Sequence, residues 1–224
     1  MAQKTEAKRF KLVGGHPSVD FINTVGAWTT NAEGYTARDY RDAAIREKLD
    51  NYADLIAWGQ HARLLNDKQA KQLLRNAQKQ PNLARSVLKR GLRLRQALYR
   101  LFRSVIENWR PEATDIEYLN KELSIARGHQ SLVESEGKLE WAWDSDEALD
   151  RVVWPLALSA AELLSSDELS RLRQCPGEDC GWLFVDTSRN GTRQWCQMRD
   201  CGNLAKVRRF RNRQAMGKEQ RAKR

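Results

Sequence analysis

Residues 175–213 read CPGEDCGWLFVDTSRNGTRQWCQMRDCGNLAKVRRFRNR, and this stretch decides how the C-terminal quarter of the chain folds. It contains two Cys-x4-Cys pairs that are separated by fifteen residues. A short turn between paired cysteines lets each pair hold a metal ion from one side, and four thiolates at tetrahedral corners suit Zn²⁺. The spacing therefore predicts one structural zinc ion per chain with four ligands: Cys175, Cys180, Cys196 and Cys201.

Two other interpretations of these cysteines fit the residues less well. The cysteines could be buried apolar residues or form disulfides, but a reducing cytosol keeps thiols free and favours metal binding by closely spaced pairs. A catalytic zinc site needs an open coordination position, which four protein thiolates do not leave. The three histidines, His16, His61 and His129, all lie upstream of the cysteines. We therefore expect the metal to stabilise the fold and to perform no chemistry.

The net charge of +10 is concentrated beside the cysteines. Residues 1–170 carry 25 Lys and Arg against 24 Asp and Glu, whereas residues 171–224 carry 14 against 5. Basic side chains on one element neutralise phosphates, and a helix fits the DNA major groove. Arg189 and Arg193, which lie between the two pairs, are expected to add contacts to the DNA backbone. A helix after the last cysteine is expected to bind DNA through five residues: Lys206, Arg208, Arg209, Arg211 and Arg213.

The basic run has two further interpretations. A charge run is often a solvated face that only keeps a chain soluble. The residues also do not distinguish DNA from RNA, although RNA-binding proteins usually expose aromatic side chains for stacking. We expect Trp182, Phe184 and Trp195 to form the core of this small module instead.

Within the module, GWLFVD is expected to form a strand that pairs with TRQWC to make a hairpin. Asp200 is expected to cap the final helix. Three apolar residues are expected to pack this helix against the hairpin: Leu204, Val207 and Phe210. The predicted module is thus a small ββα-like zinc finger with four cysteine ligands over residues 169–215, followed by a basic tail over residues 216–224.

The rest of the chain has mainly helical periodicity, which predicts a larger helical domain over residues 10–168. Helices are expected after Pro17, over 51–65, from Asp67, over 81–108, over 114–127 and over 146–165. Residues 131–143 alternate in a way that predicts a β-hairpin, so the fold class is mainly α with a small β-hairpin. We expect the two domains to fold separately, with a boundary near residue 168.

Four local features of this helical domain are also predicted. Residues 27–48 show no clear period and are expected to form a long loop. Asp67 is expected to cap its helix, and Thr114 with Glu117 has the pattern of a capping box. Asp144 is expected to cap the helix over 146–165, which Pro155 should kink.

The C-terminal module resembles the CGNR-type zinc finger, which is named for a Cys-Gly-Asn-Arg motif. The resemblance depends on CP-x3-C, LFVDTSRN, RQWCQMRDCGN and the Lys-Arg run that follows them. It implies that the four cysteines bind zinc and that the module binds DNA in a bacterial transcription regulator. Leu204 replaces the arginine of the motif, so a contact made by that arginine is either lost or moved to Lys206 or Arg208.

Upstream, GGHPSVDFINT resembles the start of the ABATE domain, a mostly helical module that usually precedes this finger. LNKEL and SAAELLSS fit the same pattern, and the two resemblances together span most of residues 10–215. The resemblance implies a domain that senses a stress signal or ligand. We therefore expect the upstream domain to bind a small-molecule effector or to dimerise the protein.

His16, Asp20 and Asn23 are the candidate residues for a ligand site in this domain. They are polar and close in sequence, and a pocket could use them to bind or protonate a ligand. The alternative is that they cap and cross-link the N-terminal segment, because buried polar groups usually satisfy backbone groups. The sequence has no evident pair of nucleophile and base, phosphate-binding glycine loop or second metal cluster, so we do not expect an enzyme.

These features together predict a DNA-binding transcription regulator. The alternatives are an RNA-associated or ribosome-associated zinc protein, and an enzyme that uses its finger to dock on another protein. No stretch approaches the roughly 20 apolar residues of a membrane helix, and the N-terminus lacks the apolar core of a signal peptide. We therefore expect a cytoplasmic protein with no membrane partner. A homodimer is a further expectation, since two copies of a short finger bind a longer site.

Overall fold

A computed structural model describes residues 10–28, 44–178 and 180–222 of the chain. Its helices are α2 (Pro17–Ile22), α3 (Tyr52–His61), α4 (Asp67–Lys79), α5 (Pro81–Ile106), α6 (Ala113–Gly128), α7 (Trp154–Leu164) and α8 (Asn203–Ala222). Its strands are β1 (Val25–Trp28), β2 (Ala44–Glu47), β3 (Gln130–Ser135), β4 (Lys138–Trp143), β5 (Leu172–Gln174) and β6 (Leu183–Val185). The predicted fold class, mainly helical with small antiparallel strand pairs, is confirmed.

Helix α5 is the central element of the helical body. It begins at Pro81, whose fixed φ suits a first helical position, and its apolar residues recur at the spacing of one buried face. Leu94, Leu98 and Phe102 are fully buried, and the helix packs against α2, α3, α4, α6 and α7. The prediction of a helix over 81–108 is therefore confirmed to within two residues at its C-terminal end.

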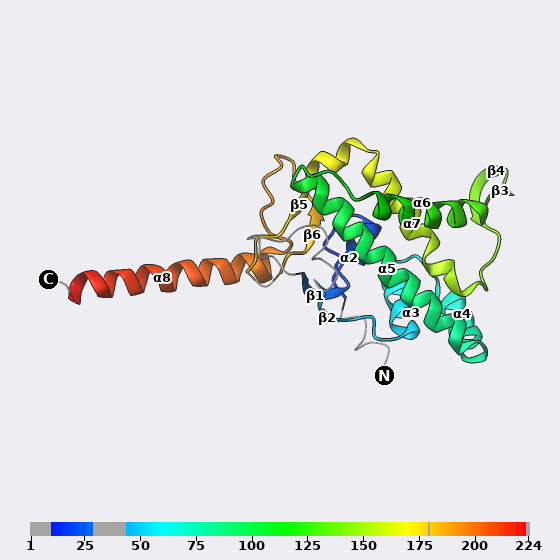
Figure 1. The fold of residues 1–224 in the computed structure, drawn as a ribbon, viewed down its shortest axis with the longest axis horizontal. Coiled ribbons are helices and arrows are strands. Elements are labelled where there is room, and N and C mark those ends of the chain that lie inside the picture. Colours follow the sequence, from blue (N-terminus) through cyan, green and yellow to red (C-terminus); the bar gives the residue numbers. More distant parts are fainter. Residues whose placement is uncertain (1–9, 29–43, 179, 223–224) are drawn as a thin grey trace.

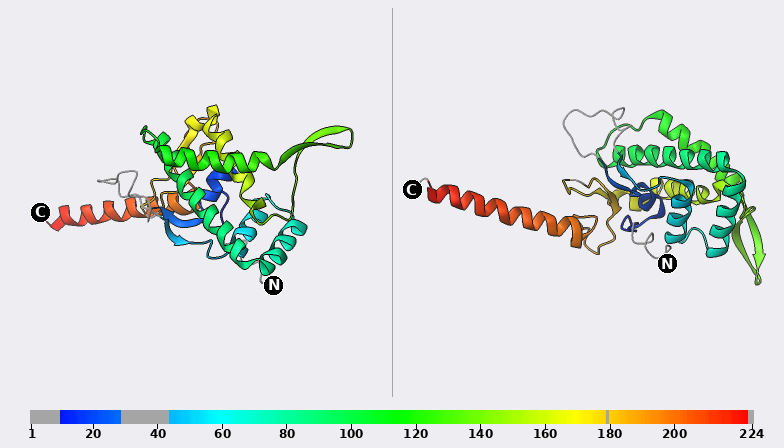
Figure 2. Two further views of the ribbon diagram at one scale, coloured as in Figure 1. Left: turned by 45° about the vertical axis from the view of Figure 1, so that its right-hand side comes forward. Right: turned by 90° about the horizontal axis from the view of Figure 1, so that it is seen from below.

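Two elements project from this body. Figures 1 and 2 show α8 extending from one end and the β3–β4 hairpin extending from the other. The hairpin confirms the strand pair predicted at 131–143, with Leu132 opposite Trp141 and Glu134 opposite Leu139. None of the helices in the described parts of the chain is long and apolar enough to cross a membrane.

The long loop predicted over 27–48 is wrong at both ends. β1 and β2 pair antiparallel, with Val25 opposite Glu47, while residues 29–43 lie outside the described part of the chain. The buried Arg95 of α5 explains why β2 forms here, because its guanidinium donates to Glu47 Oε1 at 2.8 Å and to Thr24 Oγ1 at 2.9 Å. A single charged pair between distant segments leaves no periodic signal in the sequence.

Two predicted helix caps are also corrected. Asn66 rather than Asp67 caps α4, because the Asn66 side chain accepts from Gln69 N–H at 2.9 Å and the Gln69 side chain accepts from Asn66 N–H at 2.9 Å. The N-cap of α6 is Glu112 and makes no side-chain cap hydrogen bond, so the expected Thr114 box is absent from the described helix.

The segment before α7 differs from the prediction as well. Residues Leu149–Val152 form a 3-10 turn, and Pro155 lies in the first turn of α7. A proline there lacks only an N–H that has no helical partner anyway, so it starts the helix and does not kink it. Asp144 does not cap this helix. It contacts the ring of His129, with 3.0 Å between Asp144 Oδ1 and His129 Nδ1.

One hydrophobic core runs through both predicted domains. Phe21 and Trp58 of the helical part belong to the same buried cluster as Trp182, Phe184 and Cys175 of the cysteine module. Figure 1 shows β5 and β6 lying against α2 and α5. A boundary near residue 168 therefore separates the two parts in sequence, but the same core stabilises both.

Candidate metal centre and nucleic-acid interface

The four cysteines converge on one small volume. Their Sγ atoms all lie within 4.8 Å of one another, with 3.5 Å between Cys180 and Cys196 and 3.6 Å between Cys196 and Cys201. A tetrahedral zinc ion with Zn–S bonds of about 2.3 Å places its sulfurs about 3.8 Å apart. None of the four cysteines forms a disulfide. The four predicted ligands are thus arranged as a four-thiolate metal site requires.

The backbone around the first pair supports thiolates. The N–H groups of Gly177 and Trp182, each two residues after a cysteine, hydrogen bond to the sulfurs of Cys175 and Cys180 and stabilise their ionised forms. A Cβ on Gly177 would lie 3.0 Å from the Cys180 Cβ and 3.1 Å from the Cys201 Sγ. Glycine is therefore needed here, because a larger residue would displace a ligand.

Thiols this close influence one another strongly. Hydrogen bonds from Cys180 and Cys196 lower the pKa of Cys175 to about 2, whereas the contact with Cys175 raises the pKa of Cys180 and of Cys196. One thiolate thus opposes the ionisation of its neighbours. A divalent cation stabilises all four thiolates, so the donor set, the spacing and the backbone donors fit a bound metal ion.

The strand that follows the first pair, β6, has hydrogen-bond partners on both edges, and those on one edge come from the N-terminal segment. One edge of β6 pairs with β5, and Cys175 N–H extends this ladder to the Trp182 carbonyl at 2.8 Å. On the other edge, Leu183 N–H donates to Asn23 Oδ1 at 3.1 Å and Val185 N–H donates to the Gly14 carbonyl at 2.7 Å. The N-terminal segment therefore completes the hydrogen bonding of β6.

The predicted pairing of GWLFVD with TRQWC is wrong for this reason. Both edges of β6 already have partners, so TRQWC has no strand edge to join. The buried carboxylate of Asp186 instead shapes the connection as a loop, since it accepts from Ser188 N–H at 2.8 Å and from Arg193 N–H at 3.0 Å.

Arg193 has a structural position rather than the predicted place on the DNA-binding surface. Its guanidinium donates to the carbonyls of Val13 at 2.7 Å, Trp195 at 3.1 Å and Val185 at 3.3 Å, and to that of Cys196. It also stacks over Phe184, 4.3 Å from the ring centroid. These bonds hold the second cysteine pair against β6 and the N-terminal segment. Arg189, in contrast, is exposed in the loop.

Helix α8 follows directly from the metal centre. Cys201 lies in a π-helical turn, Met198–Gly202, that continues into α8 at Asn203. Asp200, the expected cap, lies inside this turn, and Lys11 Nζ donates to its carboxylate at 2.5 Å. A metal ion bound by Cys201 would therefore fix the first turn of the helix.

The prediction that α8 packs against the finger through Leu204, Val207 and Phe210 is wrong. These side chains are 58%, 45% and 56% exposed. Figure 1 shows α8 leaving the body along its own axis, so only its first turns lie near other elements. A helix of 20 residues is about 30 Å long, which exceeds what the small finger can cover.

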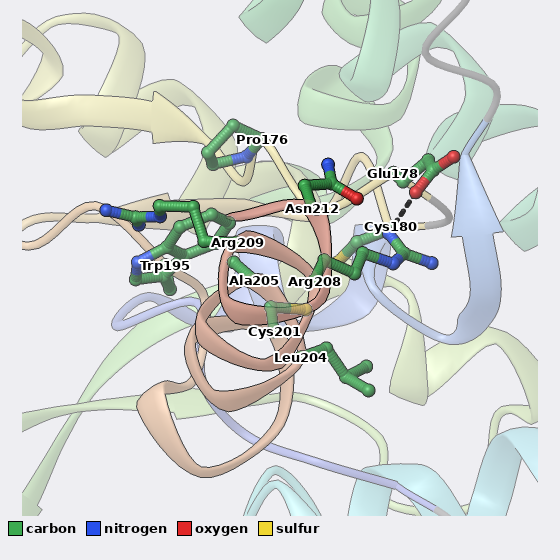
Figure 3. Close-up of a pocket in the computed structure, with 11 residues that line it drawn as sticks. Pro176, Glu178, Cys180, Trp195, Cys201, Leu204, Ala205, Arg208, Arg209 and Asn212 are labelled. Carbon is green, nitrogen blue, oxygen red and sulfur yellow. Dashed lines mark ion pairs between the residues drawn. The ribbon is translucent and has the colours of Figure 1, made fainter. Parts of the chain in front are cut away.

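A cleft of about 330 Å³ separates the first turns of α8 from the first cysteine pair. Figure 3 shows Trp195 and Arg209 on one side of this cleft and Glu178 and Arg208 on the other, where a dashed line marks their ion pair. Leu204, which replaces the arginine of the CGNR motif, lines the same cleft. The charge of Arg208 is thus partly neutralised within the chain.

The five predicted basic residues of α8, Lys206, Arg208, Arg209, Arg211 and Arg213, are all exposed. At about 100° per residue, Lys206 and Arg213 lie on one side of the helix, and Arg208 lies on the opposite side. The helix therefore presents positive charge in more than one direction.

The candidate ligand residues His16, Asp20 and Asn23 lie at the junction between α2 and its neighbours. His16 Nδ1 contacts Ser159 Oγ on α7 at 2.9 Å, and Asp20 Oδ1 accepts from Gly14 N–H at 2.7 Å. Asn23 bonds both backbone groups of Leu183. All three cross-link the N-terminal segment, which agrees with the alternative interpretation of these residues.

Burial changes the ionisation of two of these groups. Burial raises the pKa of Asp20 to about 6, although the N–H groups of Gly14 and Val13 and the charge of Arg193 oppose this shift. Burial lowers the pKa of His16, which Glu162 and Glu168 partly counteract. No signal in the sequence indicated Arg193 and β6 as structural partners of this junction, because the residues involved are about 160–180 positions apart.

Two family models match the chain. The model of the CGNR zinc finger matches residues 171–214. The ABATE model, described as "Putative stress-induced transcription regulator", matches residues 15–167. The search of curated proteins found no match.

Proposed function

The chain belongs to the ABATE family, whose model is described as "Putative stress-induced transcription regulator", and from this premise we propose that it binds DNA through α8, which a zinc ion at the four cysteines holds in place. The zinc ion is structural, with one ion per chain. The CGNR finger match and the four converging thiols support the choice of zinc. Four thiolates fill a tetrahedral shell, so the ion has no open position for a substrate.

The observation that carries the proposal is the projection of α8 from the body with its cations exposed (Figure 1). A helix in the major groove has a phosphate strand on each side. Lys206 and Arg213 on one side of α8 and Arg208 on the other are placed to neutralise one strand each. The exposed Val207 and Phe210 lie between them and suit apolar contact with thymine methyl groups.

Arg189 adds a second place for a phosphate contact, since it is exposed in the loop after β6. Arg193 is left out of the proposed interface because its guanidinium already bonds backbone carbonyls. Leu204 occupies the position of the arginine in the CGNR motif. We assign the phosphate contact of that arginine to Lys206, whose side chain is exposed two residues further along α8.

Neither catalysis nor effector binding by His16, Asp20 and Asn23 is part of the proposal. These side chains bond Ser159, Gly14 and Leu183 and thereby hold α2 against α7 and β6. Two roles were expected for the upstream domain, dimerisation and ligand sensing. We propose dimerisation, because the three residues considered for ligand sensing all make structural bonds.

A binding experiment with the full, zinc-loaded chain tests the function. Fluorescence anisotropy with labelled fragments of genomic DNA should reveal preferred sites at about 150 mM salt, and the affinity for those sites should fall steeply as salt rises. Duplex RNA of the same sequence serves as the competitor. Uniform weak binding to all DNA fragments, or equal competition by RNA, would contradict a sequence-specific DNA regulator and favour the RNA-associated alternative.

A further inference from the structure

The β3–β4 hairpin has an apolar face with no partner in the described structure. Leu132, Leu139 and Trp141 are 53%, 71% and 67% exposed. The register places all three on one face, since Leu132 is opposite Trp141 and Glu134 is opposite Leu139. Val133 and Glu140 form a pair on the other face. A two-stranded hairpin in water is marginally stable alone, so a partner on this face would stabilise the projecting part of the hairpin.

The base of the hairpin is anchored to the helical body, and this contact fixes the direction in which the two strands project. Trp143, on the same face as Trp141, packs against Trp154 with 5.5 Å between ring centroids, and Arg151 lies over its ring. His129 stacks on Trp154 at 3.9 Å. The apolar face thus begins in the core and continues outward beyond the body, as Figure 2 shows for the hairpin as a whole.

A groove of matching character lies between α3, α4 and α5. It encloses about 470 Å³ and is lined by Tyr52, Leu74, Ala77, Ala84, Leu88 and Arg85, among others. Its volume lies within the range of about 300–1,000 Å³ that encloses ligand-sized groups, which is enough for an indole ring. The hairpin points away from the body (Figure 2), and no residue of the described hairpin is among those that line the groove of its own chain.

The charges of the two surfaces are complementary. The hairpin carries Glu134 on the apolar face and Glu136 at its turn, whereas Glu140 and Lys138 lie on the other face. The charged residues that line the groove are Asp50 and Arg85. The exposed charges on α4 and the first turns of α5 are mostly positive, with Asp67 against five further cations: Lys68, Lys71, Arg75, Lys79 and Lys89. Opposite charges around an apolar centre orient two surfaces and favour their association.

We propose that the protein is a two-fold dimer in which the β3–β4 hairpin of each copy inserts Trp141 and Leu139 into the α3–α4–α5 groove of the other. The hairpin and the groove are thus the surfaces through which the upstream domain would dimerise, as proposed above. The dimer contact does not depend on DNA binding by α8. A two-fold arrangement uses each surface once per chain and closes the assembly. The dimer contact lies at the end of the body opposite to α8, so both α8 helices stay uncovered (Figure 1).

The size of the contact agrees with a weak, specific dimer. The exposed parts of Leu132, Leu139 and Trp141 amount to roughly 400 Å², given that an aromatic side chain buries about 150–250 Å². Two hairpins contribute about 800 Å², and the smaller groove surfaces that they cover bring the buried area to about 1,000 Å², which is the lower end for specific interfaces.

Sedimentation velocity on the full, zinc-loaded chain, without DNA, tests this proposal at about 1 to 100 μM, a range that brackets the Kd of a weak dimer. The wild type should change from monomer to dimer over this range. Trp141→Ser should raise the dimer Kd about tenfold or more, and so should Ala77→Glu, which puts bulk and negative charge into the groove. Val133→Ser, on the other face of the hairpin, and Ser124→Glu, on the exposed side of α6, are the matched controls and should leave the Kd unchanged.

A mixture of the two interface variants separates the proposed contact from a general loss of structure. The Trp141→Ser chain keeps its groove and the Ala77→Glu chain keeps its hairpin, so one of the two contacts can form between them. The mixture should therefore dimerise more tightly than either variant alone. A wild type that is monomeric at about 100 μM, an equal effect of Val133→Ser, or a mixture no tighter than its components would each overturn the proposal.

Discussion

Asn23, directly after α2, and Leu183 of β6 are joined by two hydrogen bonds. Asn23 Nδ2 donates to the Leu183 carbonyl at 2.8 Å, and Leu183 N–H donates to Asn23 Oδ1 at 3.1 Å. The two residues are 160 positions apart and both are buried. An amide side chain thus takes the place of a neighbouring strand and connects the helical part to the cysteine module.

Asn23→Ala should destabilise the whole protein. The substitution leaves the N–H and the carbonyl of Leu183 buried without partners, which we expect to lower the free energy of unfolding by about 2–4 kcal/mol. Urea denaturation followed by circular dichroism measures this change. Asn120→Ala, at an exposed position of α6, is the matched control and should change stability by less than about 0.5 kcal/mol. Equal effects at both positions would show that the Asn23 bonds contribute nothing.

Removal of the metal should destabilise the helical part of the chain as well as the cysteine module. Because one core includes Trp58 as well as Trp182 and Phe184, we expect the zinc-free chain or Cys201→Ser to unfold in one transition. If the loss is roughly 5 kcal/mol, the midpoint should fall by about 10–20 °C. Thermal unfolding followed by both circular dichroism and tryptophan fluorescence checks this. Two separate transitions would instead support independent folding on either side of residue 168.

Much of the fold could be predicted because its signals are local. The apolar spacing in α5, the alternation in β3 and β4 and the spacing of the four cysteines all depend on residues near one another in sequence. Within the candidate site, the metal ligands could be predicted from the local sequence pattern alone.

The rest depended on contacts between distant segments. The partners of β6 are Gly14, Asn23 and β5, and only the last of these is near β6 in sequence. Arg193 was expected on the DNA surface because charge alone does not distinguish a guanidinium that binds phosphate from one that bonds backbone carbonyls. The apolar residues of α8 were expected inside because hydrophobicity predicts burial only when a partner element is present.

The stability should depend on the ionisation of Asp20. Burial raises the pKa of Asp20 to about 6 from an ordinary value of 3.8, so the folded chain binds its proton more tightly than the unfolded chain. Stability from this group is therefore fully present below the ordinary pKa and is lost as the pH rises through about 6. Between about pH 5 and 7.5 the loss should be about 1 kcal/mol.

Asp20→Asn removes this titration and keeps an oxygen that can accept from Gly14 N–H. Urea denaturation of the zinc-loaded proteins at about pH 5 and about pH 7.5 gives the comparison. The difference between the two pH values should be smaller in the variant by about 1 kcal/mol. The same pH dependence in both proteins would mean that Asp20 ionises in the folded chain as it does in the unfolded chain.

Glu178→Gln should strengthen DNA binding. Glu178 forms an exposed ion pair with Arg208 across the cleft, so removal of its charge leaves Arg208 more available to a phosphate. One additional phosphate contact should raise the affinity by about two- to five-fold at about 150 mM salt, with a steeper salt dependence. Glu117→Gln, at an exposed position of α6, removes the same charge away from α8 and should leave DNA binding unchanged. A weaker or unaltered affinity of Glu178→Gln would mean that the ion pair does not oppose binding.

Helix α8 is the proposed DNA-binding element, and a double charge reversal tests this role most directly. Lys206→Glu with Arg213→Glu changes two exposed cations on one side of α8, whereas Lys121→Glu with Arg127→Glu makes the same change in charge at exposed positions of α6. Fluorescence anisotropy against the preferred DNA site, with zinc content measured on each protein, compares the two variants. We predict that the α8 variant binds at least about 100-fold more weakly with one zinc ion still bound, and that the α6 variant retains most of its affinity. Equal losses in both variants, or full affinity in the α8 variant, would contradict DNA binding through α8.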